Sequence, residues 1–281
     1  MLGLLRFGLN TTGARALKAL RTESPERMLP ALADALRIPA GDRPAVFATA
    51  RRDAAAAMKE AARAALHLVT WFDPAYPFLL EQIPDPPPVL WCAGQLDALA
   101  GPAVAVVGSR LAAPASLRVA RALAFGLAEA GLVVVSGLAR GIDGAAHEGA
   151  LEADGPTVAV LGSGGDCIYP REHRGLAARL QRRGALVTEF PPGAPPLAAH
   201  FPMRNRIISG LCRAVVVIEA GDRSGSLITA RLALEQGRDV LAVPGPVASG
   251  QHSGCHALIK DGAGLVETVD DVLGALEIGR A

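Results

Sequence analysis

The sequence predicts an α/β protein built on a doubly wound, extended Rossmann-like parallel sheet with a small helical N-terminal domain. Three observations support this prediction. Short runs of Val, Ala and Ile recur from Ala103 onwards, each run ends near a glycine, and a helical stretch follows each of them. Continuous apolar strands that alternate with helices are typical of a parallel sheet covered on both faces.

The first 70 residues are expected to form the small helical domain, since they are rich in Ala and Leu at helical spacing and contain no strand-like run. Ser24 and Pro25 have the residue types of an N-cap and a first-turn proline, so one helix should begin there. A second helix is expected from Pro44 to about His67, because Ala-rich sequence with scattered charge favours this state.

Residues 71–100 are expected to connect the helical domain to the next one and to pack on it, because their many prolines forbid regular helix. Residues 101–281 should then form the extended Rossmann-like domain. Its strands are expected at residues 103–107, 132–135, 157–161, 185–189, 214–219 and 239–243.

The net charge of +1 excludes a uniformly basic protein, so a polyanion would have to be bound by a local patch. Two segments are locally basic. Residues 171–183 contain five arginines and one glutamate, and residues 201–213 contain three arginines and no carboxylate. Each segment taken alone is more simply explained as the solvated face of a helix.

Cysteine use and hydropathy indicate a cytoplasmic protein with no membrane partner. The four cysteines are far apart, without C-x-x-C or zinc-ligand spacing, and should be reduced and mostly buried. The first ten residues carry no long apolar region or cleavage site, and no run approaches the ~18 apolar residues of a membrane span.

In open parallel sheets, ligands bind outside the carboxyl ends of the strands. Small residues gather at four of the predicted strand-to-helix turns. Glycine there lets backbone N–H groups approach an anion, and the helix that follows adds partial positive charge. Four such turns on one rim suit a polymer of phosphates better than one nucleotide, and they supply the candidate contacts Gly108, Ser109, Arg110, Gly137, Arg140, Ser163, Gly164 and Ser226.

The usual nucleotide fingerprints are missing. There is no G-x-x-x-x-G-K-[ST], and the glycines after residue 161 do not complete G-x-G-x-x-G, which argues against ATP hydrolysis and NAD binding. Asp143 and His147 lie four apart on an expected helix and could hold a metal or relay a proton, but without a third ligand a structural role is favoured. No serine lies in G-x-S-x-G. We therefore expect no cofactor, no metal and no catalytic residue.

The segment from His200 to Gly210 combines an aromatic residue with two arginines. Arg204 and Arg206 carry planar donor forks that suit phosphate oxygens, and Phe201 offers a flat face on which a base can stack. Together they indicate single-stranded nucleic acid. The simpler alternative is a helix start with a buried Phe and two solvated arginines.

Several of these segments, taken in order, resemble the DNA-processing protein A family (DprA or Smf). The resemblance covers residues 71 to 273 and is carried by Val106-Val107-Gly108-Ser109-Arg110, Ser136-Gly137-Leu138-Ala139-Arg140-Gly141-Ile142-Asp143, Tyr169-Pro170-Arg171, the segment 201–210, Ser224-Gly225-Ser226-Leu227-Ile228-Thr229-Ala230, Val243-Pro244-Gly245 and Gly254-Cys255-His256-Ala257-Leu258-Ile259. It implies a protein that binds and protects single-stranded DNA in natural transformation and helps load the RecA recombinase onto it, without catalysis.

The resemblance also implies particular contacts. Family DNA contacts correspond to Arg110, Arg171, Phe201, Arg204 and Asn205, whereas a family lysine is replaced here by Ala198. Members dimerise through the C-terminal part of this domain, which implies a homodimer interface at His256, Ile259 and Leu265. Many members also carry a C-terminal winged helix, and this sequence, which stops at Ala281, is expected to lack one.

Two other classes of function stay open at this point. Related Rossmann-like domains cleave nucleoside monophosphates, usually with a P-G-G-x-G-T turn and a glutamate; this sequence lacks the turn, and Glu189 and Glu219 are its best candidates for the glutamate. Alternatively, the basic rim could bind an acidic protein surface.

Overall fold

The sheet is mixed but mostly parallel, and it runs through the whole molecule. The structure is a computed structural model and describes residues 30–34 and 36–277. Nine strands follow the order β1-β2-β6-β5-β4-β3-β7-β8-β9. The strands are β1 His67–Thr70, β2 Val89–Gly94, β3 Ala103–Val107, β4 Val133–Ser136, β5 Thr157–Val160, β6 Ala185–Thr188, β7 Ala214–Val217, β8 Asp239–Ala242 and β9 Gly264–Leu265.

The six strands expected from apolar runs are present as β3 to β8, and the predicted doubly wound Rossmann-like α/β fold is confirmed. Three further strands, β1, β2 and β9, were not expected, and the two-residue β9 pairs parallel with β8 at the edge of the sheet. β2 lies within the proline-rich connection and pairs antiparallel with β6, and β1 pairs antiparallel with β2. The connection therefore extends the sheet, because its apolar run after the last proline is long enough to pair.

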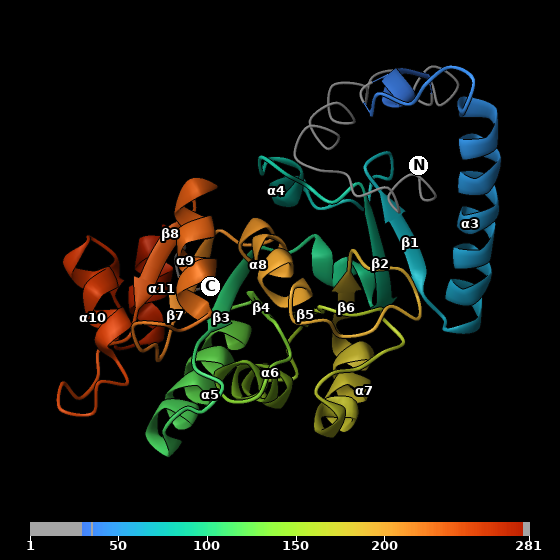
Figure 1. Ribbon diagram of the computed structural model, residues 1–281. Coiled ribbons are helices and arrows are strands. Elements are labelled where there is room, and N and C mark those ends of the chain that lie inside the picture. Colours follow the sequence, from blue (N-terminus) through green and yellow to red (C-terminus); the bar gives the residue numbers. More distant parts are fainter. Residues whose placement is uncertain (1–29, 35, 278–281) are drawn as a thin grey trace.

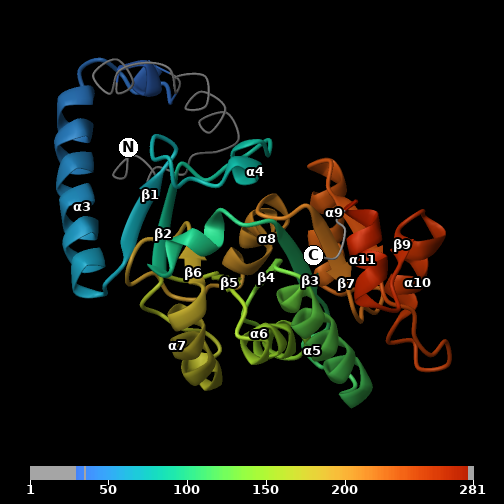
Figure 2. The same ribbon diagram turned by 180° about the vertical axis from the view of Figure 1, so that it is seen from behind.

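Helices cover both faces of the sheet. Figure 1 shows α5, α6 and α7 on one side and α8 and α9 on the other, with α3 beside β1 at one end and α10 near β8 at the opposite end. Figure 2 shows the same layers from behind, with β9 beside α10. Their bounds are α3 Arg43–Arg63, α4 Phe78–Glu81, α5 Pro114–Glu129, α6 Ile142–Glu152, α7 Arg174–Arg183, α8 His200–Gly210, α9 Ser226–Glu235, α10 Ser253–Lys260 and α11 Val269–Ala275, with short 3₁₀ turns η2 Leu96–Leu99 and η3 Arg171–His173.

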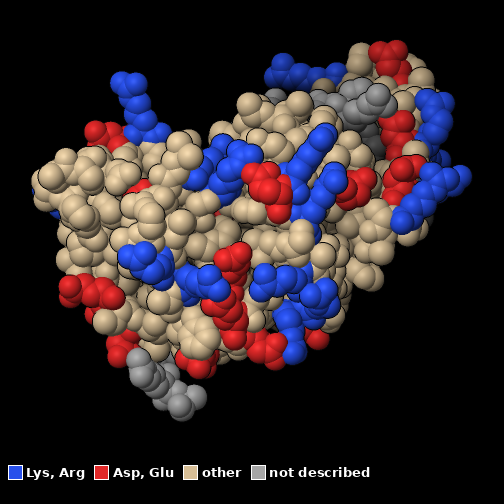
Figure 3. All heavy atoms as spheres, turned by 90° about the horizontal axis from the view of Figure 1, so that it is seen from below, with Lys and Arg blue, Asp and Glu red and all other residues tan. Residues whose placement is uncertain are grey.

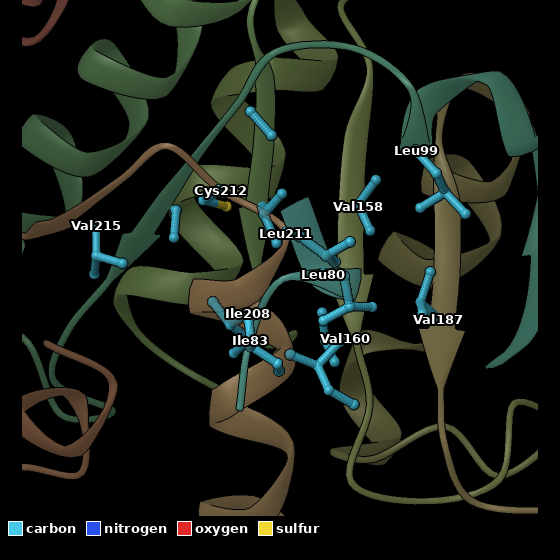
Figure 4. Close-up of a cluster of buried hydrophobic side chains, with 14 of the residues drawn as sticks. Leu80, Ile83, Leu99, Val158, Val160, Val187, Ile208, Leu211, Cys212 and Val215 are labelled. Atoms are coloured by element: carbon cyan, nitrogen blue, oxygen red, sulfur yellow. The ribbon is translucent and has the colours of Figure 1, made fainter. Parts of the chain in front are cut away.

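Alternate side chains of the central strands feed two different cores. In β3, Ala105 and Val107 pack toward α8 and α9, whereas Val104 and Val106 pack against α5 and α6. Figure 4 shows the first of these cores, in which Leu80 of α4 and Ile208 of α8 meet the valines of β5, β6 and β7. This packing holds the C-terminal half of α8 against the sheet and thereby positions the start of the helix, which carries candidate DNA contacts.

The helix predicted from Pro44 is present as α3, whereas the helix start at Ser24 lies outside the described residues. Cys92, Cys212 and Cys255 are buried, as the sequence predicts. No helix among residues 30–34 and 36–277 is both long and apolar enough to cross a membrane. The boundaries proposed for a separate helical domain remain a prediction.

Candidate nucleic-acid interface

The candidate site lies where the winding of the sheet changes direction. The chain builds outward from β3 through β4 and β5 and then returns to place β7 on the other side of β3. Such a switch point opens a crevice at the carboxyl ends of the strands. A pocket of about 820 Å³, here called the switch-point crevice, occupies this place, and seven of the predicted contacts line it: Gly108, Ser109, Arg110, Phe201, Arg204, Asn205 and Ser226.

A cation and two aromatic rings form the mouth of the crevice. The Arg110 guanidinium carbon lies 5.4 Å from the centroid of the Phe201 ring, within the range of a cation–π contact. The Tyr169 ring lies 5.5 Å from Phe201 at an angle of 48° and is itself exposed. A Cβ at Gly162 would lie 2.9 Å from the Phe201 ring, so the absence of a side chain at the end of β5 permits this packing. The mouth thus offers one positive charge and stacking surface together.

The turn that carries Arg110 is held at both ends by Glu219. The Ser109 N–H donates to the Glu219 carbonyl oxygen at 2.8 Å, and the Ala113 N–H donates to the Glu219 carboxylate at 3.0 Å. Ala113 precedes the first residue of α5 and has no capping side chain of its own, so the carboxylate satisfies one of the free amides at this helix start. Between these anchors Arg110 is exposed and projects over the crevice.

Arg204 is buried beneath the mouth and is engaged by the protein itself. Its guanidinium donates to the carbonyl oxygens of Gly137, at 2.7 Å, and Val160. A Cβ on residue 137 would lie only 2.2 Å from the nearest guanidinium nitrogen, so this approach requires glycine. Burial lowers the pKa of Arg204 to about 10, and Asp143 opposes that effect. Arg204 therefore ties the ends of β4 and β5 to α8.

The Asp143 carboxylate is the counterpart of Arg204. It accepts the N–H groups of Gly137, at 3.1 Å, and Ala139, at 3.3 Å. Burial raises the pKa of Asp143, and Arg204 and the two amides oppose this rise. The turn after β4 was expected to offer its amides to phosphate; the Gly137 amide is instead used by an internal carboxylate, which argues against that role.

His147 also has an internal role. Its Nδ1 lies 2.7 Å from the Thr157 hydroxyl, which donates to a backbone oxygen, so Nδ1 carries the hydrogen. Its Nε2 is buried without a partner. Among the described residues, no group of three potential metal ligands lies close together. Asp143 and His147 of α6 instead form contacts within the fold.

The burial of His147 predicts a loss of stability in acid. Burial, aided by His173 and Arg204, lowers its pKa from 6.5 to about 3. The unfolded chain therefore takes up a proton that the folded protein refuses, and stability should fall as the pH drops below 6.5, by at most about 1.4 kcal/mol per pH unit. Urea unfolding at a series of pH values measures this slope. The slope should become smaller in His147→Leu, and an unchanged slope would contradict the assignment.

Arg206 points away from the crevice into an ion-pair cluster. Its two terminal nitrogens donate to the Glu189 carboxylate, each at 2.7 Å, and its Nε donates to Asp85 at 3.2 Å. Burial lowers the pKa of Arg206, but the two carboxylates more than compensate and raise it. The fork is thus fully occupied, which argues against the phosphate contact expected from the sequence.

The remaining predicted contacts differ in whether a ligand can reach them. Arg140 lines a small pocket beside the mouth with Gly137, although it also pairs with Glu172. Ser163 and Gly164 are buried and bond to the backbone of Cys167 and Ala194, so they hold a loop and are not available to a ligand. Arg171 is exposed and begins η3, two residues after Tyr169.

The crevice also contains residues that the sequence did not single out. Exposed Tyr169 and Leu111 lie at its mouth, and Leu111 is 87% exposed. Arg223 and Thr229 lie on the side formed by α9 and the turn before it. The segments that hold Tyr169 and Thr229 were noticed as patterns, but only the folded chain shows that these side chains face the same space as Phe201.

Comparison with known proteins identifies the family. The family model described as DNA recombination-mediator protein A matches residues 67–277. Protein Smf of Escherichia coli (strain K12) is 50% identical over 214 residues, which are 76% of this chain and 57% of that protein. DNA processing protein DprA of Streptococcus pneumoniae is 48% identical over 205 residues, which are 73% of this chain and 72% of that protein. The chain therefore spans less than two thirds of the E. coli relative.

Solved structures agree with this assignment. The X-ray structure of DprA from Streptococcus pneumoniae superimposes with a TM-score of 0.87 at 40% identity, covering 97% of this chain and 95% of that one. A structure that concerns the single-stranded DNA binding mode of DNA processing protein A from Helicobacter pylori gives a TM-score of 0.68 at 28% identity, covering 76% of this chain and 97% of that one. The chain belongs to the DNA recombination-mediator protein A (DprA/Smf) family.

Proposed function

We propose that this protein binds single-stranded DNA at the switch-point crevice and acts as a recombination mediator. In this role it protects DNA taken up in natural transformation and helps to load the RecA recombinase onto it, in the cytoplasm and without a catalytic step. The observation that carries the proposal is the exposed Arg110 placed over the Phe201 ring at the mouth of the crevice. The relative from Helicobacter pylori, whose single-stranded DNA binding has been described, supports it.

The mouth suits an unpaired strand because a nucleotide can use both of its groups: the base can stack on the Phe201 ring, and the phosphate can bind the Arg110 guanidinium. Arg110 covers part of the Phe201 ring, so a base that stacks there takes the place of the guanidinium. The displaced guanidinium can then bind the phosphate attached to that base. A duplex keeps its base faces stacked inside and cannot offer one to the ring. Single strands should therefore bind more tightly than duplex, with little sequence preference.

The two glutamates that favoured a nucleotide-cleaving enzyme are both engaged in the fold. Glu189 accepts two hydrogen bonds from Arg206, and Glu219 caps α5. A catalytic carboxylate needs a free oxygen within reach of the reacting atom. These contacts favour the binding function over hydrolysis.

A homodimer is part of the proposal. His256 and Ile259 lie on α10, and Leu265 belongs to β9, the edge strand of the sheet beside it. Leu265 is exposed, and an edge strand offers unpaired backbone groups to a second copy. Sedimentation of the protein measures whether it dimerises.

A gel-shift titration tests the function. One sample is titrated with a labelled single strand, and unlabelled single strand, duplex and mononucleotide compete in separate arms. We expect single strand to compete best. Competition by mononucleotide alone, with release of free base, would favour the enzyme, whereas failure of every nucleic acid to bind would favour an interaction with an acidic protein.

Phe201→Ala should weaken single-stranded DNA binding while keeping its salt dependence. The lost stacking corresponds to about 1 to 3 kcal/mol, but the ring carries no charge and so releases no counterion. Filter binding at several salt concentrations measures both quantities. A changed slope of log affinity against log salt would mean that the ring also positions a cation such as Arg110.

A further inference from the structure

We infer that α7 carries a second nucleic-acid contact, along which the backbone of a single strand continues after it leaves the switch-point crevice. The inference rests on the proposed function. The contact is formed by four exposed arginines, here called the α7 arginine face: Arg171, Arg174, Arg179 and Arg182.

Three of the four arginines share one side of α7, and Arg171 precedes them in η3. Leu176, Ala177 and Leu180 are the buried residues of α7, and they pack against the strands. Arg174, Arg179 and Arg182 lie on the opposite side, in the spacing of an amphipathic helix. Arg174 and Arg182 are eight positions apart, or ~12 Å along the axis, a length that roughly four stacked nucleotides cover at one phosphate per 3.4 Å.

The charges of this face are not neutralised within the described part of the protein. No ion pair or side-chain hydrogen bond joins any of the four to another described residue, although Arg183 beside them pairs with Asp154. By contrast, Arg121 of α5 pairs with Glu148 and Glu152. Figure 3, which views the side of α5, α6 and α7, shows several groups of blue side chains on this face with red ones between them.

Folding alone does not explain this arrangement. Arg174 is the first residue of α7, whose first turn contains no acidic residue, and a cation at a helix N-terminus is unfavourable. Arg179 and Arg182 are like charges three positions apart, which also destabilises a helix. A bound polyanion relieves both repulsions.

The face continues directly from the site already described. Tyr169 and Pro170 line the small pocket beside the mouth together with Arg110 and Phe201, and Arg171 is the next residue. A DNA strand that passes the mouth therefore meets Arg171, the first residue of the α7 arginine face, at once. No large apolar side chain is exposed between Tyr169 and Leu197, whereas protein interfaces have an apolar centre. This chemistry fits the phosphates of a strand better than an acidic protein surface.

The test compares two lengths of DNA on one triple variant, Arg174→Ala, Arg179→Ala and Arg182→Ala. With an oligothymidylate of about thirty nucleotides, we expect binding to weaken between ten- and a hundredfold at about 0.1 M salt, and the slope of log affinity against log salt to fall by about 2, or 0.7 for each arginine. With one of about six nucleotides, which fills the crevice alone, affinity should stay as in the unchanged protein.

A control variant separates this contact from a general loss of charge. The control removes the same number of positive charges from α3 and α5, through Arg52→Ala, Arg63→Ala and Arg121→Ala. It should bind both DNA lengths as tightly as the unchanged protein does. A second version of the α7 variant with glutamine keeps the side-chain length, and thermal unfolding should show both versions folded. Unchanged binding of the long strand, or equal loss in the control, would overturn the inference. If the unchanged protein bound neither length, the proposed function itself would fail.

Discussion

Arg204→Leu should destabilise the protein by about 3 to 5 kcal/mol, the largest effect expected of any single change at the site. The substitution leaves the Asp143 carboxyl buried with its two amide donors but without a cation, and it leaves the Gly137 and Val160 carbonyl oxygens without their donor. Urea unfolding measures the loss. Because Arg204 joins the ends of β4 and β5 to α8, DNA binding should be lost together with stability.

The pH dependence of this variant distinguishes a lost charge pair from simple loss of packing. Without Arg204, only hydrogen bonds oppose the effect of burial on Asp143, whose pKa is already raised above 3.8. A carboxyl group with a raised pKa is favourable to folding below its unfolded pKa, and that stability is lost as the pH rises. The stability that Arg204→Leu loses relative to the unchanged protein should therefore be larger near pH 7 than near pH 4. The double variant Arg204→Leu/Asp143→Leu should recover part of the stability, and no recovery would contradict the pairing.

The sequence predicted the framework of the fold because that information is local. Each of the six apolar runs is long enough to form a buried strand and is followed by its own helix, so strand, turn and helix can be identified in succession. β1 and β2 were missed for a related reason. β1 has only four residues, and β2 directly follows a run of prolines. β2 pairs antiparallel with β6, which lies about 90 positions away in the sequence, and β1 joins the sheet only through β2.

The sequence alone identifies a side chain that is available to DNA only where that side chain is exposed and forms no ion pair within the protein. Arg110 follows two small residues, Gly108 and Ser109, in a turn, and it is exposed in the structure. Arg204 and Arg206 are equally basic and two positions apart, and the sequence predicted both as phosphate contacts. In the fold, the charge of Asp143 acts on Arg204, and the Glu189 carboxylate accepts two hydrogen bonds from Arg206. Spacing within one segment cannot reveal partners that only tertiary packing supplies.

Arg110→Glu should reduce the affinity for single-stranded DNA roughly a hundredfold at about 0.1 M salt, since it replaces an attraction to phosphate by a repulsion. Arg110→Ala should give a smaller loss and lower the slope of log affinity against log salt by about 0.7. The loss should be similar for all sequences, because the contact is to the backbone. Filter binding with several oligonucleotides across a range of salt measures it.

Stability should not change with this substitution, which makes the result specific to binding. Arg110 is exposed, and its turn is fixed by Glu219 through the backbone at Ser109 and Ala113 and not through the guanidinium. Arg118→Glu, an identical charge change at an exposed position on α5, is the matched control and should bind nearly as well as the unchanged protein. If Arg110→Glu and Arg118→Glu lost affinity equally, the net charge of the protein and not the mouth of the crevice would govern binding. A contact at a defined place requires that reversing Arg110 weakens binding and that reversing Arg118 does not.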